Sequence, residues 1–168
     1  MTAADYEVPT ALVDQAPNVV MTRTFSKIFG LAGMRLGWLY GPPTIVDVMR
    51  RLSMTFPVSA PAVAAGIAAV GDRAHCDHVF AHNGDLRGRF TEQLTDLGLH
   101  VYPSETNFVL VRFDATRRPA QAGYQYLVER GIVARMFNSA DYRDMIRITV
   151  GFEPEMQAAA EALRDYLL

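Results

Sequence analysis

The sequence RTFSKIFGLAGMRLG, residues 23–37, contains Lys27, the one lysine of a 168-residue chain that has fifteen arginines. Arginine stays protonated, whereas a lysine amine can lose its proton and attack a carbonyl to form a Schiff base. Alternatively, Lys27 is an ordinary surface lysine in a chain where arginine has replaced the others. Its neighbours decide between a reactive amine and such a surface residue. Thr24, Ser26 and Arg35 supply two hydroxyls and a guanidinium fork, a set that suits a phosphate group. The stretch therefore indicates a reactive amine beside a phosphate site.

The segments on either side of Lys27 predict that it lies in a loop. Residues 18–21 form a short apolar run that is typical of a buried strand, and residues 34–40 form a second, partly aromatic run. Gly30 and Gly33 lie between these runs, where they let the backbone turn tightly and approach a ligand. Loops that connect the strands of a rigid scaffold often contain catalytic and binding residues.

An amine beside a phosphate site matches the needs of pyridoxal phosphate (PLP), whose aldehyde binds a lysine and whose phosphate anchors the ring. The order of residues excludes two other phosphate-binding loops. A P-loop has its lysine after the glycines, whereas Lys27 precedes Gly30 and Gly33. The chain also contains no Gly-x-Gly-x-x-Gly dinucleotide fingerprint.

Residues 23–37 contain every fixed position of the pattern R-T-x-S-K-x-x-x-L-A-G-x-R-x-G. This pattern resembles the cofactor-lysine segment of fold-type I PLP enzymes, specifically the histidinol-phosphate aminotransferase group of the class I/II aminotransferases. The resemblance implies that Lys27 binds PLP and shuttles protons during amino transfer. It also implies that Thr24, Ser26 and Arg35 hold the cofactor phosphate.

A second set of candidate residues lies near the C-terminus. Residues 131–135 and 144–151 both read as short strands, one with Arg135 and the other with Arg147. The default interpretation of an isolated strand arginine is a surface ion pair. The sequence IRITVG, residues 146–151, however resembles the family segment whose arginine binds the substrate α-carboxylate, a planar group that a guanidinium fork matches. By the same resemblance, Arg135 recognises a phosphate or other acidic group of the substrate.

The sequence YPSETNFVLV, residues 102–111, resembles the family's P-S-x-x-N-F-V-L-V strand, which opens the small domain. Asn107 would then border the active site. The alternative is that Asn107 only bonds to local backbone at the start of a strand, as asparagine often does.

The fold class that we predict is α/β, as the C-terminal part of a PLP-dependent transferase fold. Its parts are a partial large domain with the cofactor lysine (1–72), a bridging helix (73–98) and a small α+β domain (99–168). Periodicity and helix-start signals predict helices over 44–54, 60–70, 73–97, 119–130 and 153–168, and strands over 106–113, 131–136 and 144–150.

Composition excludes several functional classes. A net charge of −2 gives no basic footprint for nucleic acid. The most apolar stretch, residues 58–70, is too short to span a bilayer, and the polar start of the chain predicts no signal peptide. A single cysteine, Cys76, cannot form an intrachain disulfide and fits the cytoplasm. His75, His78 and His82 share one face of a predicted helix, but we interpret them as solvated histidines and predict no metal site.

The resemblance covers nearly the whole chain but only about the C-terminal half of a family member. Most of the family's large-domain sheet lies upstream of the cofactor lysine, and 26 residues precede Lys27 here. The residues that hold the cofactor ring are absent, and Asp5 is not assigned to the role of the ring-nitrogen aspartate. Three explanations account for this partial coverage: a truncated product, one half of a split enzyme, or a fragment of a longer chain. Because unpaired strand edges promote association, we expect a homodimer or a complementing N-terminal half.

The function that we predict from the sequence is PLP-dependent amino transfer between an amino acid or amino-alcohol phosphate and a 2-oxo acid. One alternative in the same fold is a threonine-phosphate-type decarboxylase, which keeps the same lysine segment. Another, from a different class, is a non-catalytic remnant or assembly subunit that retains the motif by descent.

Overall fold

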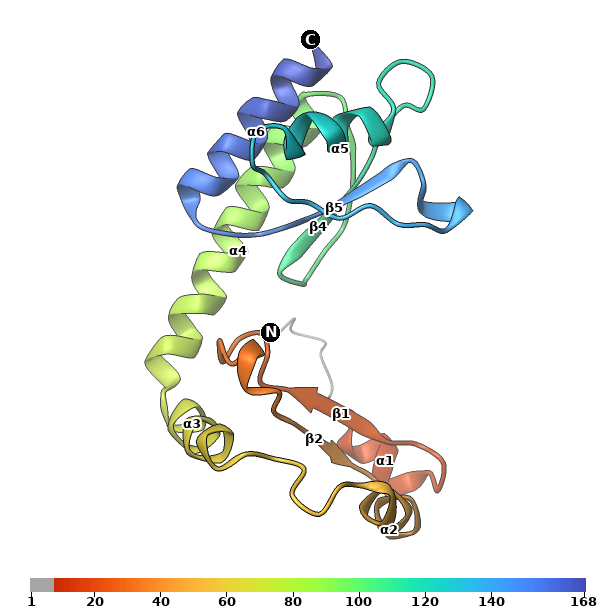
Figure 1. Cartoon of the computed structure of the whole chain (residues 1–168), viewed down its shortest axis with the longest axis vertical. Coiled ribbons are helices and arrows are strands. Elements are labelled where there is room, and N and C mark those ends of the chain that lie inside the picture. Colours follow the sequence, from red (N-terminus) through yellow and green to blue (C-terminus); the bar gives the residue numbers. More distant parts are fainter. Residues whose placement is uncertain (1–7) are drawn as a thin grey trace. The chain divides into compact units, whose positions relative to one another are not determined.

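The computed structural model describes residues 8–168, and the chain divides into two compact units, residues 1–80 and 81–168 (Figure 1). The helix α4 (Arg73–Asp96) contributes residues to both units. The other elements of the first unit are α1 (Thr10–Gln15), β1 (Met21–Thr24), the 3-10 helix η1 (Ala32–Met34), β2 (Gly37–Tyr40), α2 (Pro43–Leu52) and α3 (Ala60–Gly71).

The first unit is built on an antiparallel ribbon of β1 and β2. Met21 pairs with Tyr40 at one end, and Thr24 pairs with Gly37 at the other. The loop 25–36 leaves and re-enters the ribbon at this second end. A two-stranded ribbon is at best marginally stable alone in water, so it depends on what packs against it.

Helix α3 packs against the loop 25–36. Ser59 caps its N-terminus by accepting a hydrogen bond from the Ala62 backbone N–H (3.3 Å). Ala62 and Gly66 are buried, and a Cβ on Gly66 would lie 2.5 Å from Cδ2 of Leu36 in that loop. The remaining surface of α3 is also apolar and includes Ile67, which is 71% exposed. A helix that is apolar all round is normally buried, so the exposed side of α3 is unusual for a surface helix.

The second unit is a three-stranded antiparallel sheet covered on one face by helices (Figure 1). The strand order is β3-β4-β5. Besides the end of α4, its elements are β3 (His100–Tyr102), β4 (Phe108–Arg112), α5 (Ala120–Val128), the 3-10 helix η2 (Ala140–Tyr142), β5 (Met145–Thr149) and α6 (Glu153–Leu167).

The hydrophobic core of the second unit lies between this sheet and the helices α4, α5 and α6. One face of the sheet supplies two cross-strand pairs, Val109 with Ile148 and Val111 with Ile146, all at most 4% exposed. The helices contribute Phe90, Leu127 and Leu163 among others. Because side chains alternate along a strand, the opposite face of β4 and β5 carries Leu110 opposite Arg147 and Phe108 opposite Thr149.

Three predicted strands need correction. The strand predicted over 18–21 is instead β1, which begins at Met21 because a turn after α1 precedes it, with the Val19 N–H directed to the Ala16 carbonyl (3.5 Å). The strand predicted over 34–40 begins only at Gly37, since η1 and a left-handed residue at 35 occupy its start. The strand predicted over 131–136 is reduced to a single bridge.

The shortened strand has a physical reason. Helix α5 ends in a turn in which Gly131 has a φ of +75° and Ile132 N–H donates to the Leu127 carbonyl (3.0 Å). Ile132, Ala134 and Met136 then pack against the core by alternation, without a continuous ladder of hydrogen bonds. Helix α1 and strand β3 were not predicted; both are very short. The predicted helices match α2 to α6 within one or two residues at each end.

Candidate active site

Lys27 lies in the loop that joins β1 to β2, as predicted. The loop is closed at its base, where the Phe25 N–H donates to the Leu36 carbonyl (3.0 Å) and the Leu31 N–H donates to the Phe25 carbonyl (2.9 Å). Within it, the Gly30 N–H donates to the Lys27 carbonyl (2.8 Å), and Gly30 has a φ of +67° that favours glycine. The backbone of Lys27 is therefore fixed in a tight turn while its side chain is exposed.

The hydroxyls of Thr24 and Ser26 lie together beside Lys27. Thr24 Oγ1 donates to Ser26 Oγ (2.8 Å), and the Ser26 N–H donates back to Thr24 Oγ1 (3.0 Å). This local turn places two hydroxyls and a backbone amide at the end of β1. Such donors are suited to a phosphate oxygen.

Arg35 closes the other end of the loop in a strained conformation. Its φ of 52° and ψ of 46° are left-handed, and among residues 8–168 it is the one residue other than glycine with a positive φ. This conformation costs a side-chain-bearing residue about 1–2 kcal/mol, and such strain collects at functional sites. Arg35 Nη1 donates to the Ala32 carbonyl (2.8 Å), which holds the guanidinium over its own loop.

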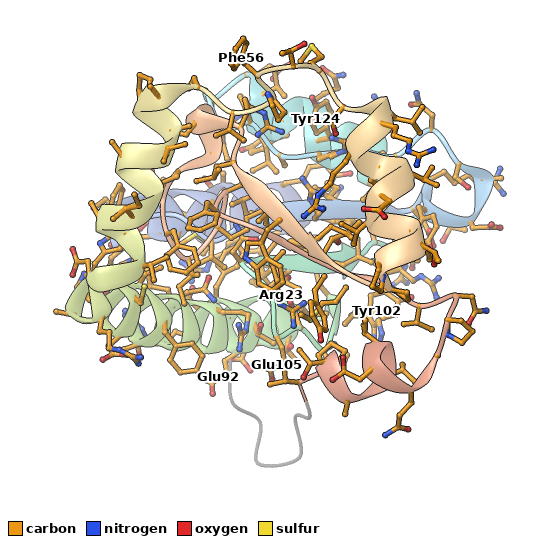
Figure 2. The ribbon with its side chains drawn as sticks, turned by 90° about the horizontal axis from the view of Figure 1, so that it is seen from below. Arg23, Phe56, Glu92, Tyr102, Glu105 and Tyr124 are labelled. Atoms are coloured by element: carbon orange, nitrogen blue, oxygen red, sulfur yellow. The ribbon has the colours of Figure 1, made fainter. Side chains whose placement is uncertain are left out.

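Arg35 also lines an open groove of about 740 Å³ in the first unit. The other lining residues are Gly33, Met34 and the segment 56–60, which links α2 to α3. Phe56 in this segment, labelled in Figure 2, is 87% exposed. This segment carries no functional signal in the sequence, because a Phe-Pro-Val-Ser run before a helix reads only as a helix start.

Arg147 and Arg135 are brought together in the second unit by a single antiparallel bridge. The Arg135 N–H donates to the Arg147 carbonyl (3.0 Å), and the Arg147 N–H donates to the Arg135 carbonyl (2.9 Å). Directly opposed residues of an antiparallel pair project to the same face. Among residues 8–168, no acidic side chain forms an ion pair with either arginine. Two cations on one face without a carboxylate partner are suited to an anionic ligand.

An unpartnered donor on the Arg147 side chain is a second feature expected of a ligand site. Its Nε is buried and has no hydrogen-bond partner among the described residues. Its guanidinium carbon lies 5.0 Å from the ring centroid of Phe108, at cation–π distance. A buried N–H without an acceptor is rare in native proteins, and an absent ligand is one explanation for it.

Asn107 is half-buried and directly precedes β4. Its carbonyl accepts a hydrogen bond from the Val150 N–H (2.9 Å), which ties it to the residue after β5. The candidate residues thus form two groups, one in each unit: Lys27 with Thr24, Ser26 and Arg35, and Arg147 with Arg135 and Asn107.

Two further features are absent from residues 8–168: a cluster of metal ligands and a membrane-spanning helix. No three His, Cys, Asp or Glu side chains lie close enough together to hold a metal ion. In the same residues, no helix combines the length and the apolar character needed to cross a membrane.

Comparison with known proteins places this fold in a class. The chain belongs to the aminotransferase class I and II family, whose model matches residues 2–163. The histidinol-phosphate aminotransferase of Rhodospirillum centenum is 49% identical over 167 residues, which are 99% of this chain and 46% of that protein. The histidinol-phosphate aminotransferase of Nitrobacter winogradskyi is 43% identical over 97% of this chain and 45% of its own length. The chain therefore spans somewhat less than half the length of these relatives.

Solved structures agree with this placement. The crystal structure of histidinol-phosphate aminotransferase from Sinorhizobium meliloti in complex with pyridoxal-5'-phosphate is 36% identical, with a TM-score of 0.82 over 90% of this chain and 41% of that chain. L-threonine-O-3-phosphate decarboxylase from Porphyromonas gingivalis shares the fold, with a TM-score of 0.70 at 23% identity over 94% of this chain and 49% of that chain. The predicted fold class, a partial PLP-dependent transferase fold, is confirmed.

Proposed function

We propose that this chain supplies the cofactor-lysine portion of a PLP-dependent aminotransferase that acts on an amino acid or amino-alcohol phosphate and a 2-oxo acid. The observation that carries the proposal is the 25–36 loop. It presents the single lysine of the chain, with its backbone fixed in a turn, between a hydroxyl pair and a strained arginine. This donor set fits an aldehyde cofactor with a phosphate group.

Each candidate residue has a separate role in this proposal. When bound, PLP withdraws electrons from the α-carbon of the substrate. Lys27 holds the cofactor and moves protons to and from that carbon through its amine. Thr24, Ser26 and Arg35 bind and orient the phosphate.

The arginine pair binds the substrate. Arg147 receives the α-carboxylate, for which its buried Nε supplies one unpartnered donor. Arg135, on the same face, receives a second acidic group of the substrate, such as a phosphate. Asn107 directly precedes β4, and in this proposal it borders the bound substrate.

The first unit has the surface of a protein that takes a partner. Among its described residues, the buried apolar side chains are Val13, Met21 and Ala62, whereas Leu52, Met54 and Phe56 are at least 76% exposed. We propose that a second copy of the chain or a complementing N-terminal half covers this surface, since large apolar patches mark interfaces. Light scattering on the purified chain, alone and with an added N-terminal segment of a relative, distinguishes the two partners.

Covalent trapping tests the cofactor proposal directly. The purified chain is incubated with PLP and reduced with borohydride, and its intact mass is measured. Lys27→Ala and the charge-preserving Lys27→Arg are treated in the same way. Because only Lys27 and the N-terminal amine can react, the mass change is simple to assign. One cofactor adduct that both substitutions remove supports the proposal. An adduct that survives them, or none in the wild type, favours a non-catalytic remnant.

A further inference from the structure

Arg87 is a largely buried arginine of α4 that holds a loop belonging to the arginine-pair site. Its side chain is 16% exposed. Nη1 donates to the Thr106 carbonyl (2.9 Å) and Nη2 to the Glu105 carboxylate (3.0 Å), as a two-pronged fork. One helical turn earlier, Asn83 Nδ2 donates to the same Thr106 carbonyl (3.2 Å). Two side chains of α4 therefore converge on one peptide group; Glu105 is labelled in Figure 2.

The loop that they hold is also bonded to itself. Ser104 Oγ donates to the Phe108 carbonyl (2.6 Å), and Thr106 Oγ1 donates to the same carbonyl (3.2 Å). The Thr106 N–H donates to Ser104 Oγ (3.2 Å). Residues 104–108 consequently form a connected set, so that a shift at Thr106 is passed on to the start of β4.

Two residues of this set connect to β5, the strand that carries Arg147, or to the residue that follows it. The ring of Phe108 is 5.0 Å from the guanidinium carbon of Arg147, and Asn107 is bonded through its carbonyl to Val150. A continuous path of contacts therefore leads from Arg87 through Thr106 and Phe108 to Arg147.

The ion pair with Glu105 is the lesser part of what Arg87 does. Glu105 is 75% exposed at its side chain, and exposed ion pairs contribute little, about 0–1 kcal/mol. What Arg87 adds beyond such a pair is a fixed position for the Thr106 peptide, because a guanidinium fork sets both distance and direction.

We propose that Arg87, with Asn83, is a positioning residue for substrate binding: it fixes residues 104–108 so that Phe108 keeps the Arg147 guanidinium ready for a substrate carboxylate. This inference rests on the proposed carboxylate-binding role of Arg147. Arg87 itself does not touch the substrate.

The test follows the Arg147 Nε–H signal by NMR in the ¹⁵N-labelled full-length chain, which is titrated with glutarate at constant ionic strength. Glutarate carries carboxylates but no amine, so it probes the arginine site alone. Arg147→Lys assigns the signal by its loss. The variants are Arg87→Gln, Arg87→Lys and the matched control Arg89→Gln, which removes an arginine of the same helix that pairs with Asp85 and Glu153 instead.

We expect saturable glutarate binding in the wild type and in Arg89→Gln. In Arg87→Gln we expect the dissociation constant to rise roughly tenfold, by analogy with the loss of outer-shell hydrogen bonds that orient metal ligands. Arg87→Lys, which keeps a donor and the charge, restores part of the affinity. Amide exchange at Asn107 and Phe108 should also be faster in Arg87→Gln than in Arg89→Gln, which separates loosening of this loop from general unfolding.

Two results overturn the inference in distinguishable ways. If the wild type shows no glutarate-dependent shift of the Arg147 signal, the proposed role of Arg147 fails, and the positioning role fails with it. If the wild type binds and Arg87→Gln binds equally well, Arg147 keeps its proposed role and only the positioning role of Arg87 is wrong. Glu105→Gln separates loss of the ion pair from loss of the Thr106 bond: Arg87 keeps the Thr106 bond in this variant, so its glutarate affinity should stay near that of the wild type.

Discussion

A Cβ atom on Gly37 would lie 2.8 Å from the carbonyl oxygen of Arg23 and 3.7 Å from Cα of Thr24. Both neighbours are backbone atoms of β1, so neither can rotate away. The two strands thus approach closely at the point where the Lys27 loop begins and ends. Gly37 is required there for space and not for an unusual φ.

Gly37→Ala should therefore push β1 and β2 apart. We expect the free energy of unfolding of the first unit to fall by about 1–3 kcal/mol, the usual cost of overpacking. The yield of borohydride-trapped PLP should fall as well, because Thr24 moves with β1. Gly33→Ala is the matched control in the same loop, since its added Cβ would meet nothing within 4 Å. Equal melting temperatures and equal trapping in the two variants would contradict this account.

Arg35 combines backbone strain with a proposed role at the phosphate. Arg35→Gly removes the left-handed strain, whereas Arg35→Ala keeps it, so the glycine variant should be more stable than the alanine variant by about 1 kcal/mol. Both variants lack the guanidinium and should lose PLP affinity to a similar extent. Chemical denaturation and PLP titration monitored by absorbance measure the two effects separately. A glycine variant that binds PLP as well as the wild type would remove Arg35 from the phosphate site.

Local patterns predicted the position of Lys27 in a loop better than they predicted the bounds of the strands around it. Lys27 was found because its hydroxyl and glycine neighbours are close in sequence and their chemistry is readable one residue at a time. The left-handed backbone of Arg35 left no such signal, because arginine rarely adopts it and the strain is imposed by the loop closure.

Contacts between distant residues account for most of what the sequence did not reveal. The bridge between Arg135 and Arg147 joins residues on different strands and depends on how α5 ends at Gly131. The Arg87–Thr106 bond spans nineteen positions. Periodicity reports which face of an element is apolar, but it does not report which element lies opposite.

The Tyr40 hydroxyl donates a 2.5 Å hydrogen bond to Asp14 Oδ1, joining β2 to α1. This hydrogen bond, and secondarily the negative charge of Asp14, raises the pKa of Tyr40 above its ordinary value of about 10. Because the protonated phenol is the form that the fold favours, the stabilisation is fully present below about pH 10 and is lost as pH rises through the raised pKa. The difference between the absorbance titrations of the wild type and of Tyr40→Phe isolates the Tyr40 phenol among seven tyrosines. Asp14→Asn should bring its pKa back toward the ordinary value, and an unchanged titration in that variant would exclude Asp14 as the cause.

Arg147 and Arg112 allow a test of whether binding is gained at the expense of stability. Both lie on the same sheet face, but Arg112 pairs with Asp144 (3.1 Å) and lies over Tyr102, whereas Arg147 has a buried, unpartnered Nε and another arginine beside it. An unsatisfied buried donor costs about 1–3 kcal/mol, whereas a cation–π contact such as that with Phe108 contributes about 0.5–2 kcal/mol.

Arg147→Met should therefore be at least as stable as the wild type, by up to about 1 kcal/mol, while it loses glutarate binding altogether. Arg112→Met should instead lose up to about 1 kcal/mol, because it gives up a formed ion pair and a ring contact. Glutarate binding should persist in this second variant, since Arg147 remains. Urea unfolding measures the stability of each variant, and glutarate titration measures its affinity for glutarate. If Arg147→Met is the less stable of the two, the Nε of Arg147 is satisfied within the folded chain, and its value as evidence for a carboxylate site is lost.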